Sequence, residues 1–275
     1  METRRSNTWI WVALGVCAGL VVCCGLALVV TVGVPAAVRL VRDGDWDRVQ
    51  TTRLGGERTE RVEETIDVGT APELVVDSFA GRVTIRAGGD GSVRIVATKH
   101  VPAGVSPEEI VLTMRTEGSR VRVTARPTQT NVTKRWVEFD ITVPAQTALD
   151  VRTGAGAVEV RGVQGDLEVD AGAGGIEIEG AAGSARLTAG AGGIDYAGRP
   201  SGSCTFRVGA GGITLRFPAD TDVEVDLAAG VGGVSSQLPV YGRVARHSIH
   251  GRLGTGEKGR VSATAGVGGV NLLRW

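Results

Sequence analysis

The chain has 275 residues with 30 basic and 30 acidic side chains, so its formal net charge is zero. This balance excludes a protein that holds nucleic acid or acidic surfaces through a large excess of positive charge. Glycine is frequent, at 42 residues, aromatic residues make up only 4%, and Val, Ile and Leu remain plentiful. The composition therefore favours a folded chain with many tight turns over a disordered one.

The first apolar segment is residues 8–38, TWIWVALGVCAGLVVCCGLALVVTVGVPAAV, and no charged residue interrupts it. About 20 apolar residues can cross a bilayer as a helix, whereas the apolar core of a signal peptide has about 7–15 residues. We therefore predict a short N-terminal tail at 1–7 and a retained single-span anchor at 8–38. Cleavage near Val34 and attachment of a lipid to a cysteine of this segment are the alternatives.

Residues 39–61 are polar and mixed in charge, which predicts a juxtamembrane linker. In residues 62–148 short runs alternate between apolar and polar side chains, and Gly, Pro, Asp or Ser separate most of them. This period of two is the signal of β-strands. Residues 106–109, SPEE, predict one short helical turn. The expected strands lie at 65–68, 73–77, 82–86, 92–99, 110–116, 120–125 and 136–143.

A glycine phrase then returns as GAGA, GAGG or GVGG, and the steps between its first glycines are 18, 18, 19, 21 and 36 residues. Apolar columns flank each phrase, and polar columns lie between them, which predicts two strands in every repeat. Residues 149–275 are therefore expected to form a parallel β-helix-like solenoid of six coils with about 18 residues each. The core ladder after the phrase is Val158, Ile176, Ile194, Ile213, Val234 and Val270.

The glycine phrase itself stands between the two strands of each coil. A sharp corner needs a positive φ or a close backbone approach, and glycine allows both. A phosphate-binding loop would need a helix after it, and a calcium β-roll would need a regular Asp, so neither is expected. The predicted corner glycines are Gly154, Gly156, Gly172, Gly174, Gly175, Gly190, Gly192, Gly193, Gly209, Gly211, Gly212, Gly230, Gly232, Gly233, Gly266, Gly268 and Gly269.

Residues 137–180 read VEFDITVPAQTALDVRTGAGAVEVRGVQGDLEVDAGAGGIEIEG, a strand, Val-Pro, Leu-x-Val-x-Thr and then repeated Gly-x-Ile/Val units. In this cadence the chain resembles the bacterial adhesin-like β-strand-repeat family (the DUF4097 type), which is similar to the head-GIN auto-transporter adhesins. The resemblance covers residues 62–275 and implies a parallel β-helix-like domain, commonly on a membrane anchor, without family catalytic residues. Residues 237–258 depart from the repeat and are expected to form an exposed loop between the last two coils.

Three carboxylates, Glu159, Glu177 and Asp195, fall in one outward column on consecutive coils. Stacked carboxylates raise one another's pKa unless a cation lies between them, so a divalent cation or a basic partner is one interpretation. The other is a solvated face that nearby Arg161 and Arg152 compensate, and we favour it.

The remaining reactive residues suggest no catalytic site. His247 and His250 have an H-x-x-H spacing without further ligands nearby, and in a strand or loop that spacing does not converge on a metal. Cys204 falls in an inward column and is expected to be an inert core residue. No motif of a hydrolase or a zinc enzyme stands out, so no catalytic residue, no cofactor site and no assigned metal site are predicted.

Arginines flank the apolar segment on both sides, and a long domain that follows such a segment can be translocated. We therefore expect a single-pass protein of the cytoplasmic membrane, anchored through residues 8–38, with its C-terminal domain outside the cytoplasm. Its predicted role is a non-enzymatic interaction or structural module of the cell envelope, with a protein or cell-wall partner and no nucleic acid. The alternative is a membrane-tethered regulatory or envelope-stress-sensing scaffold.

Overall fold

The computed structural model describes residues 39–41, 48–54, 56–88, 91–129 and 134–275. The expected N-terminal tail and membrane anchor, residues 1–38, lie outside the described residues. Among the described residues, no helix has the length and the apolar character that a membrane span requires.

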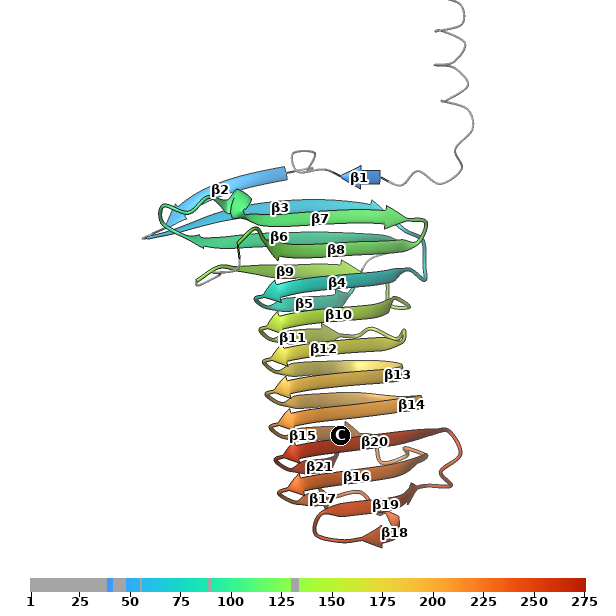
Figure 1. Ribbon diagram of the computed structural model, residues 1–275. Helices are drawn as coiled ribbons and strands as arrows, with labels where there is room; N and C mark the ends of the chain where they lie inside the picture. The colour runs from blue at the N-terminus through green and yellow to red at the C-terminus, as the bar shows by residue number, and fades with distance from the viewer. Residues whose placement is uncertain (1–38, 42–47, 55, 89–90, 130–133) are drawn as a thin grey trace, which may run out of the picture. The chain divides into compact units, whose positions relative to one another are not determined.

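The described chain is all-β, as the sequence predicts. Its twenty-one strands join one sheet, and η1 (Pro107–Glu109) is a single turn of 3₁₀ helix. This turn confirms the expectation for residues 106–109, where Pro107 lies in the first helical turn. The sheet is mixed: antiparallel pairs at both ends flank a long parallel part (Figure 1). The repeat predicts only the parallel part.

Five strands near the N-terminus of the described chain form antiparallel pairs. β3 and β6 pair along their full length, from Glu57 opposite Pro102 to Asp67 opposite Ser92. The predicted linker at 39–61 is therefore largely strand, and its mixed charge conceals this because few of its positions are apolar. The five strands are β1 (Arg39–Val41), β2 (Arg48–Leu54), β3 (Glu57–Asp67), β6 (Ser92–Pro102) and β7 (Ile110–Glu117).

The rest of the sheet is built from coils, each with one strand before a corner and one strand after it. Successive coils pair in parallel and in register, first strand with first strand and second with second (Figure 1). Two of the coils precede residue 149. The coils are β4–β5 (Glu73–Ala80, Val83–Ala87), β8–β9 (Arg120–Pro127, Trp136–Val143), β10–β11 (Ala148–Ala155, Val158–Arg161), β12 with the start of β13 (Leu167–Ala173, Ile176–Ala191), the end of β13 with the start of β14 (Ile194–Ala210), the end of β14 with β15 (Ile213–Phe217), β16–β17 (Val223–Val231, Val234–Ser236) and β20–β21 (Gly259–Val267, Val270–Arg274).

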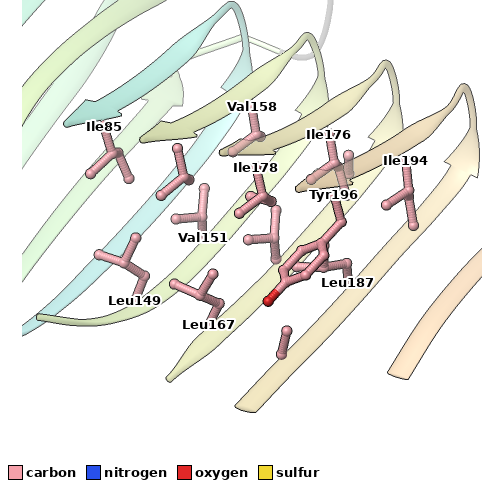
Figure 2. Packing of buried hydrophobic residues seen from close by; sticks show 14 of the residues in the cluster. Ile85, Leu149, Val151, Val158, Leu167, Ile176, Ile178, Leu187, Ile194 and Tyr196 are labelled. Carbon is pink, nitrogen blue, oxygen red and sulfur yellow. The ribbon is translucent and has the colours of Figure 1, made fainter. Parts of the chain in front are cut away.

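The apolar columns meet as ladders between the two layers of strands. Ile194 lies between Ile176 and Ile213, and all three are buried. Figure 2 shows Val158, Ile176 and Ile194 in a row, with Leu149, Leu167 and Leu187 in the facing layer. Each ladder removes a continuous strip of apolar surface from water, the main favourable contribution to folding. In spatial order the predicted ladder reads Val158, Ile176, Ile194, Ile213, Val270 and Val234.

Chain order and spatial order differ at both ends of the stack. The last coil of the chain, β20–β21, lies between the coil that ends in β15 and the coil β16–β17. At the other end, β4–β5 lies between β8–β9 and β10–β11. The expected loop at 237–258 contains a hairpin, β18 (Tyr241–Val244) and β19 (Ser248–Leu253), which pairs antiparallel with β16 (Figure 1). A strand at this place hydrogen-bonds the exposed edge of β16, which a loop would leave open.

The carboxylate of Asp222 anchors the segment between β19 and β20, which leads the chain back into the stack. This carboxylate accepts hydrogen bonds from the Thr255 hydroxyl at 2.8 Å and from the backbone N–H of Gly256 at 2.5 Å. The Thr255 hydrogen bond is the main reason that the pKa of Asp222 lies below its usual value. The turn after β19 is thereby tied to the residue just before β16.

The corners show why the repeat is rich in glycine. The third residue of each phrase has φ between 136° and 141°, for example Gly192 at 136°. A Cβ on Gly192 would lie 2.0 Å from the carbonyl oxygen of Gly174 in the preceding coil. A Cβ on the first glycine, Gly190, would lie 2.4 Å from the carbonyl oxygen of Gly172. Both positions therefore require glycine, one for its φ and both for the close approach of two backbones.

The fourth residue of the phrase is different. A Cβ on Gly193 would have its nearest neighbour, the carbonyl oxygen of Gly212, at an ordinary contact distance of 3.5 Å. The φ of Gly193 is not positive, and Ala157 occupies the same place in the coil of β10 and β11. The structure thus separates the predicted corner glycines into two positions that need glycine and one that accepts a side chain.

Two substitutions in one corner test this distinction. We expect Gly192→Ala to lower the free energy of unfolding by at least about 2 kcal/mol, since it combines an unfavourable φ with a backbone clash. Gly193→Ala should change it by no more than about 0.5 kcal/mol or stabilise the fold slightly, because alanine restricts the unfolded chain. Chemical denaturation of both variants measures the difference, and equal losses would contradict the assigned corner geometry.

Candidate functional site

The three candidate carboxylates share one outer face of the stack. Glu159 pairs in register with Glu177, and Glu177 with Asp195, on β11, β13 and β14. They line a shallow groove of about 370 Å³. The groove is open because the residues beside the carboxylates carry small side chains or none. These floor residues are Ala157, Gly175, Gly193 and Gly212.

Each of these carboxylates has an arginine on a neighbouring coil. Arg82 Nη1 lies 3.1 Å from Glu159 Oε1, and Arg161 Nη2 lies 3.8 Å from Glu177 Oε1. Arg216 pairs with Asp195. The arginines are well exposed, so each pair contributes at most about 1 kcal/mol to stability. Their main effect is to compensate a column of like charges.

The arginines occupy the space beside these carboxylates. Within the described part of the chain, no group of three or more His, Cys, Asp or Glu side chains is placed to hold a metal ion. A cation at Glu177 would have to displace Arg161, which also lies 3.2 Å from Glu179 Oε2. Of the two arginines that the sequence suggests, Arg161 thus contacts this column, whereas Arg152 pairs with other carboxylates, Asp150 and Asp170.

The opposite outer face carries a second shallow groove, of about 360 Å³, with four acidic residues and one basic residue on its walls. Asp150 lies partly buried in this groove, and its Oδ1 is buried without a hydrogen-bond partner. Burial raises the pKa of Asp150 above its usual value, Glu168 raises it further, and Arg152 opposes both. The charged residues of the groove are Glu73, Asp150, Asp166, Glu168 and Arg186.

The other residues that the sequence singles out are apart from these grooves. His250 Nδ1 lies 2.8 Å from Asp226 Oδ1 on the neighbouring strand, whereas His247 is exposed in the hairpin turn. Cys204 is buried in the core, and burial raises the pKa of its thiol. The structure therefore brings neither histidine nor the cysteine into a catalytic arrangement with the carboxylate column.

Tyr196 is a tyrosine side chain that lies fully buried within the core. Its ring packs against Phe206 and Phe217, with centroids 5.1 and 6.1 Å away. Its hydroxyl is buried without a hydrogen-bond partner, and burial raises its pKa well above the usual value. Phe206 and Phe217 are also fully buried, so we assign this group of three rings to packing.

The antiparallel end contains a buried charged pair that the sequence pattern does not reveal. Lys99 Nζ lies 2.9 Å from Glu60 Oε1, and the lysine side chain is only 4% exposed. On the other face of β6, His100 stacks on Trp136 with ring centroids 4.8 Å apart, and its Nδ1 lies 2.6 Å from Glu57 Oε1. The residues in each of these contacts are about 35–45 positions apart in the chain, so the sequence does not show that they meet. The one signal in the sequence is that Lys99 alternates in step with the inward residues Ile95 and Ala97.

Comparisons with known proteins find a similar fold but no matching family model. No family model matches the chain, and no curated protein matches it. A solved structure of a "putative cell adhesion protein" from Clostridium sporogenes is similar, with a TM-score of 0.50 and 14% identity over 78% of this chain and all of that chain. A "putative adhesin" from Bacteroides fragilis has a TM-score of 0.43 and 11% identity over 78% of this chain and 97% of that chain. At 14% identity the first likeness shows a shared, adhesin-like fold.

The raised pKa of Asp150 predicts a pH dependence. The unfolded chain ionises Asp150 at its usual pKa, while the folded chain keeps the proton to a higher pH, so this residue makes the protein less stable as the pH rises between the two values. We expect Asp150→Asn to raise the free energy of unfolding at pH 7. The gain should vanish below the usual pKa of an aspartate, where both states are protonated.

Denaturant titrations at a series of pH values measure this gain. Asp170→Asn is the matched control, since it removes a carboxylate from the same face beside the same Arg152. An equal gain for both variants would assign the effect to overall charge and contradict the role given to burial of Asp150.

Proposed function

We propose that this chain is a non-enzymatic interaction or structural module of the bacterial cell envelope, built on a β-solenoid of the DUF4097 type. The observation that carries the proposal is the fold itself, a stack of in-register coils that resembles the solved structure of the clostridial "putative cell adhesion protein". Repeated coils present the same outer columns again and again, which suits an extended contact surface. The candidate carboxylates contribute to that surface as compensated charges.

The proposal includes a membrane anchor at residues 8–38, from which the stack extends outside the cytoplasm. The support is the uninterrupted apolar sequence of that segment. The partner is then a protein or a cell-wall component at the cell surface, and neither a cofactor nor nucleic acid takes part.

The location is tested first, with a single new thiol in the hairpin turn. His247 is exposed, and His247→Cys keeps the backbone carbonyl that accepts a hydrogen bond from the N–H of Ala229 at 2.9 Å. An impermeant maleimide should label this variant in intact cells. The parent protein, which has four cysteines, is the control for background labelling; among them Cys204 is buried and its thiol pKa is raised. Labelling only after lysis would contradict the envelope location and favour an internal scaffold.

The role is tested with the purified full chain in mild detergent. We expect it to be retained by cell-wall material or by a surface protein, without consuming glycan. Selective capture of one membrane protein would favour the regulatory scaffold, and turnover of a polysaccharide would contradict both non-enzymatic roles.

A further inference from the structure

The end of the stack beyond β16 is closed by the hairpin, and β18 is its outermost strand. β18 pairs with β19, and in the described part of the chain no other strand pairs with it (Figure 1). All four of its residues, Tyr241 to Val244, are exposed. An exposed strand edge is a template for a further strand, which proteins usually cover or keep very short.

The hydrogen-bond pattern shows which backbone groups of β18 face outward. The N–H of Ala245 donates to the carbonyl of Ser248 at 2.8 Å, which places Ala245 on the side of β19. In an antiparallel ladder the N–H and C=O of one residue point to the same side, and the side alternates along the strand. Tyr241 and Arg243 therefore bond β19, while Gly242 and Val244 direct their N–H and C=O groups away from it.

A row of apolar side chains runs from β16 through β19 and ends at the exposed Val244 of β18. Leu227, Ile249 and Val244 are register partners on β16, β19 and β18. Leu227 and Ile249 are fully buried, but Val244 is 64% exposed. An apolar residue on an added strand would cover Val244 and extend the row by one position, with the gain that burial of apolar surface brings.

The charged rows on the outer face also end at β18. Arg260 Nη2 lies 2.6 Å from Glu224 Oε2, and Asp226 pairs with His250 on the neighbouring strand. The row of Asp226 and His250 continues to Arg243 on β18. Among the described residues Arg243 has no ion-pair partner, so a carboxylate on the next strand would complete the row.

We propose that β18 is a docking edge for an extended segment of a partner protein that alternates acidic and apolar residues. The segment adds one strand to the sheet, places a carboxylate beside Arg243 and an apolar side chain beside Val244, and bonds the backbone of Gly242 and Val244. A second copy of β18 fits less well, because its own Arg243 would bring like charges together. The proposal rests on the interaction role above and names the surface and the chemistry of its partner.

The test uses the purified full chain in mild detergent and a fluorescein-labelled peptide, Gly-Ser-Glu-Val-Glu-Val-Glu-Ser-Gly, followed by fluorescence anisotropy. We expect this peptide to bind at least about tenfold more tightly than its analogue with Lys in place of Glu, the ratio that one charge-assisted contact gives. Arg243→Glu should reverse the preference between the two peptides.

A second pair of variants tests whether the backbone edge is used. Val244→Pro removes an N–H that faces outward and therefore leaves the fold's own ladder intact. We expect it to weaken peptide binding about tenfold through a lost hydrogen bond and a steric clash. The matched control is Val244→Thr, which keeps the N–H and the shape and should bind within about threefold of the parent. Circular dichroism melts verify that both variants are folded.

Two results would overturn the proposal. One is an absence of binding of the Glu peptide to the parent protein. The other is binding that Val244→Pro leaves unchanged and that inorganic polyphosphate displaces, which would identify a general anion patch. Neither result depends on the side of the membrane or on retention by cell-wall material, so a failure here is distinguishable from a failure of the proposed function.

Discussion

At each corner of the stack, a carbonyl oxygen of one coil occupies the place where the Cβ of the next coil's glycine would lie. The contact of Gly192 with Gly174, at 2.0 Å for that added Cβ, is one example of a column that runs from coil to coil. Two backbones can approach so closely only in one relative position. The corner therefore fixes the register of both strands that leave it, and the apolar ladders and outer columns follow from that register.

In-register stacking has an electrostatic cost, because a polar column places like side chains on successive coils. Arginines from neighbouring coils compensate Glu159, Glu177 and Asp195. Asp150 has Arg152 at 3.1 Å, but its carboxyl is partly buried, and this burial raises its pKa. In the described part of the chain, β18 combines an open strand edge with an Arg243 that has no ion-pair partner and a Val244 that is 64% exposed. This combination of backbone edge, charge and apolar side chain is why we assign partner contact to the hairpin edge and not to a groove.

The sequence predicts the parts of this fold that repeat. Period and columns identify the six coils from residue 149 and the inward position of Ile194, because stacked coils impose the same burial at the same place. The sequence does not reveal the coil β4–β5. Gly81 lies 75 residues before its counterpart Gly156, and the phrase around Gly81 reads FAGR. The insertion of β20–β21 ahead of β16–β17 is also hidden, because neighbouring coils carry nearly the same columns and fit in either order.

The sequence also predicts only the repeating part of the candidate site. Alternation places Glu159, Glu177 and Asp195 in one column and suggests Arg161 as a partner. Arg82 is not predicted, because only the three-dimensional pairing places β5, which it precedes, beside β11. The hairpin at β18 and β19 has too few apolar residues for its alternation to stand out among glycines and arginines.

The order of the coils is the central claim, because it decides which strand forms the edge, and disulfide cross-linking tests it most directly. Thr214 is the register partner of Asn271, and Asn271 is the register partner of Ser235. Partners on adjacent strands are about 4.8 Å apart, within reach of a disulfide, and residues two strands apart are about twice as far, beyond it. Our account predicts that Thr214→Cys with Asn271→Cys cross-links under mild oxidation and that Thr214→Cys with Ser235→Cys does not. The reverse result would show coils stacked in chain order and would contradict it.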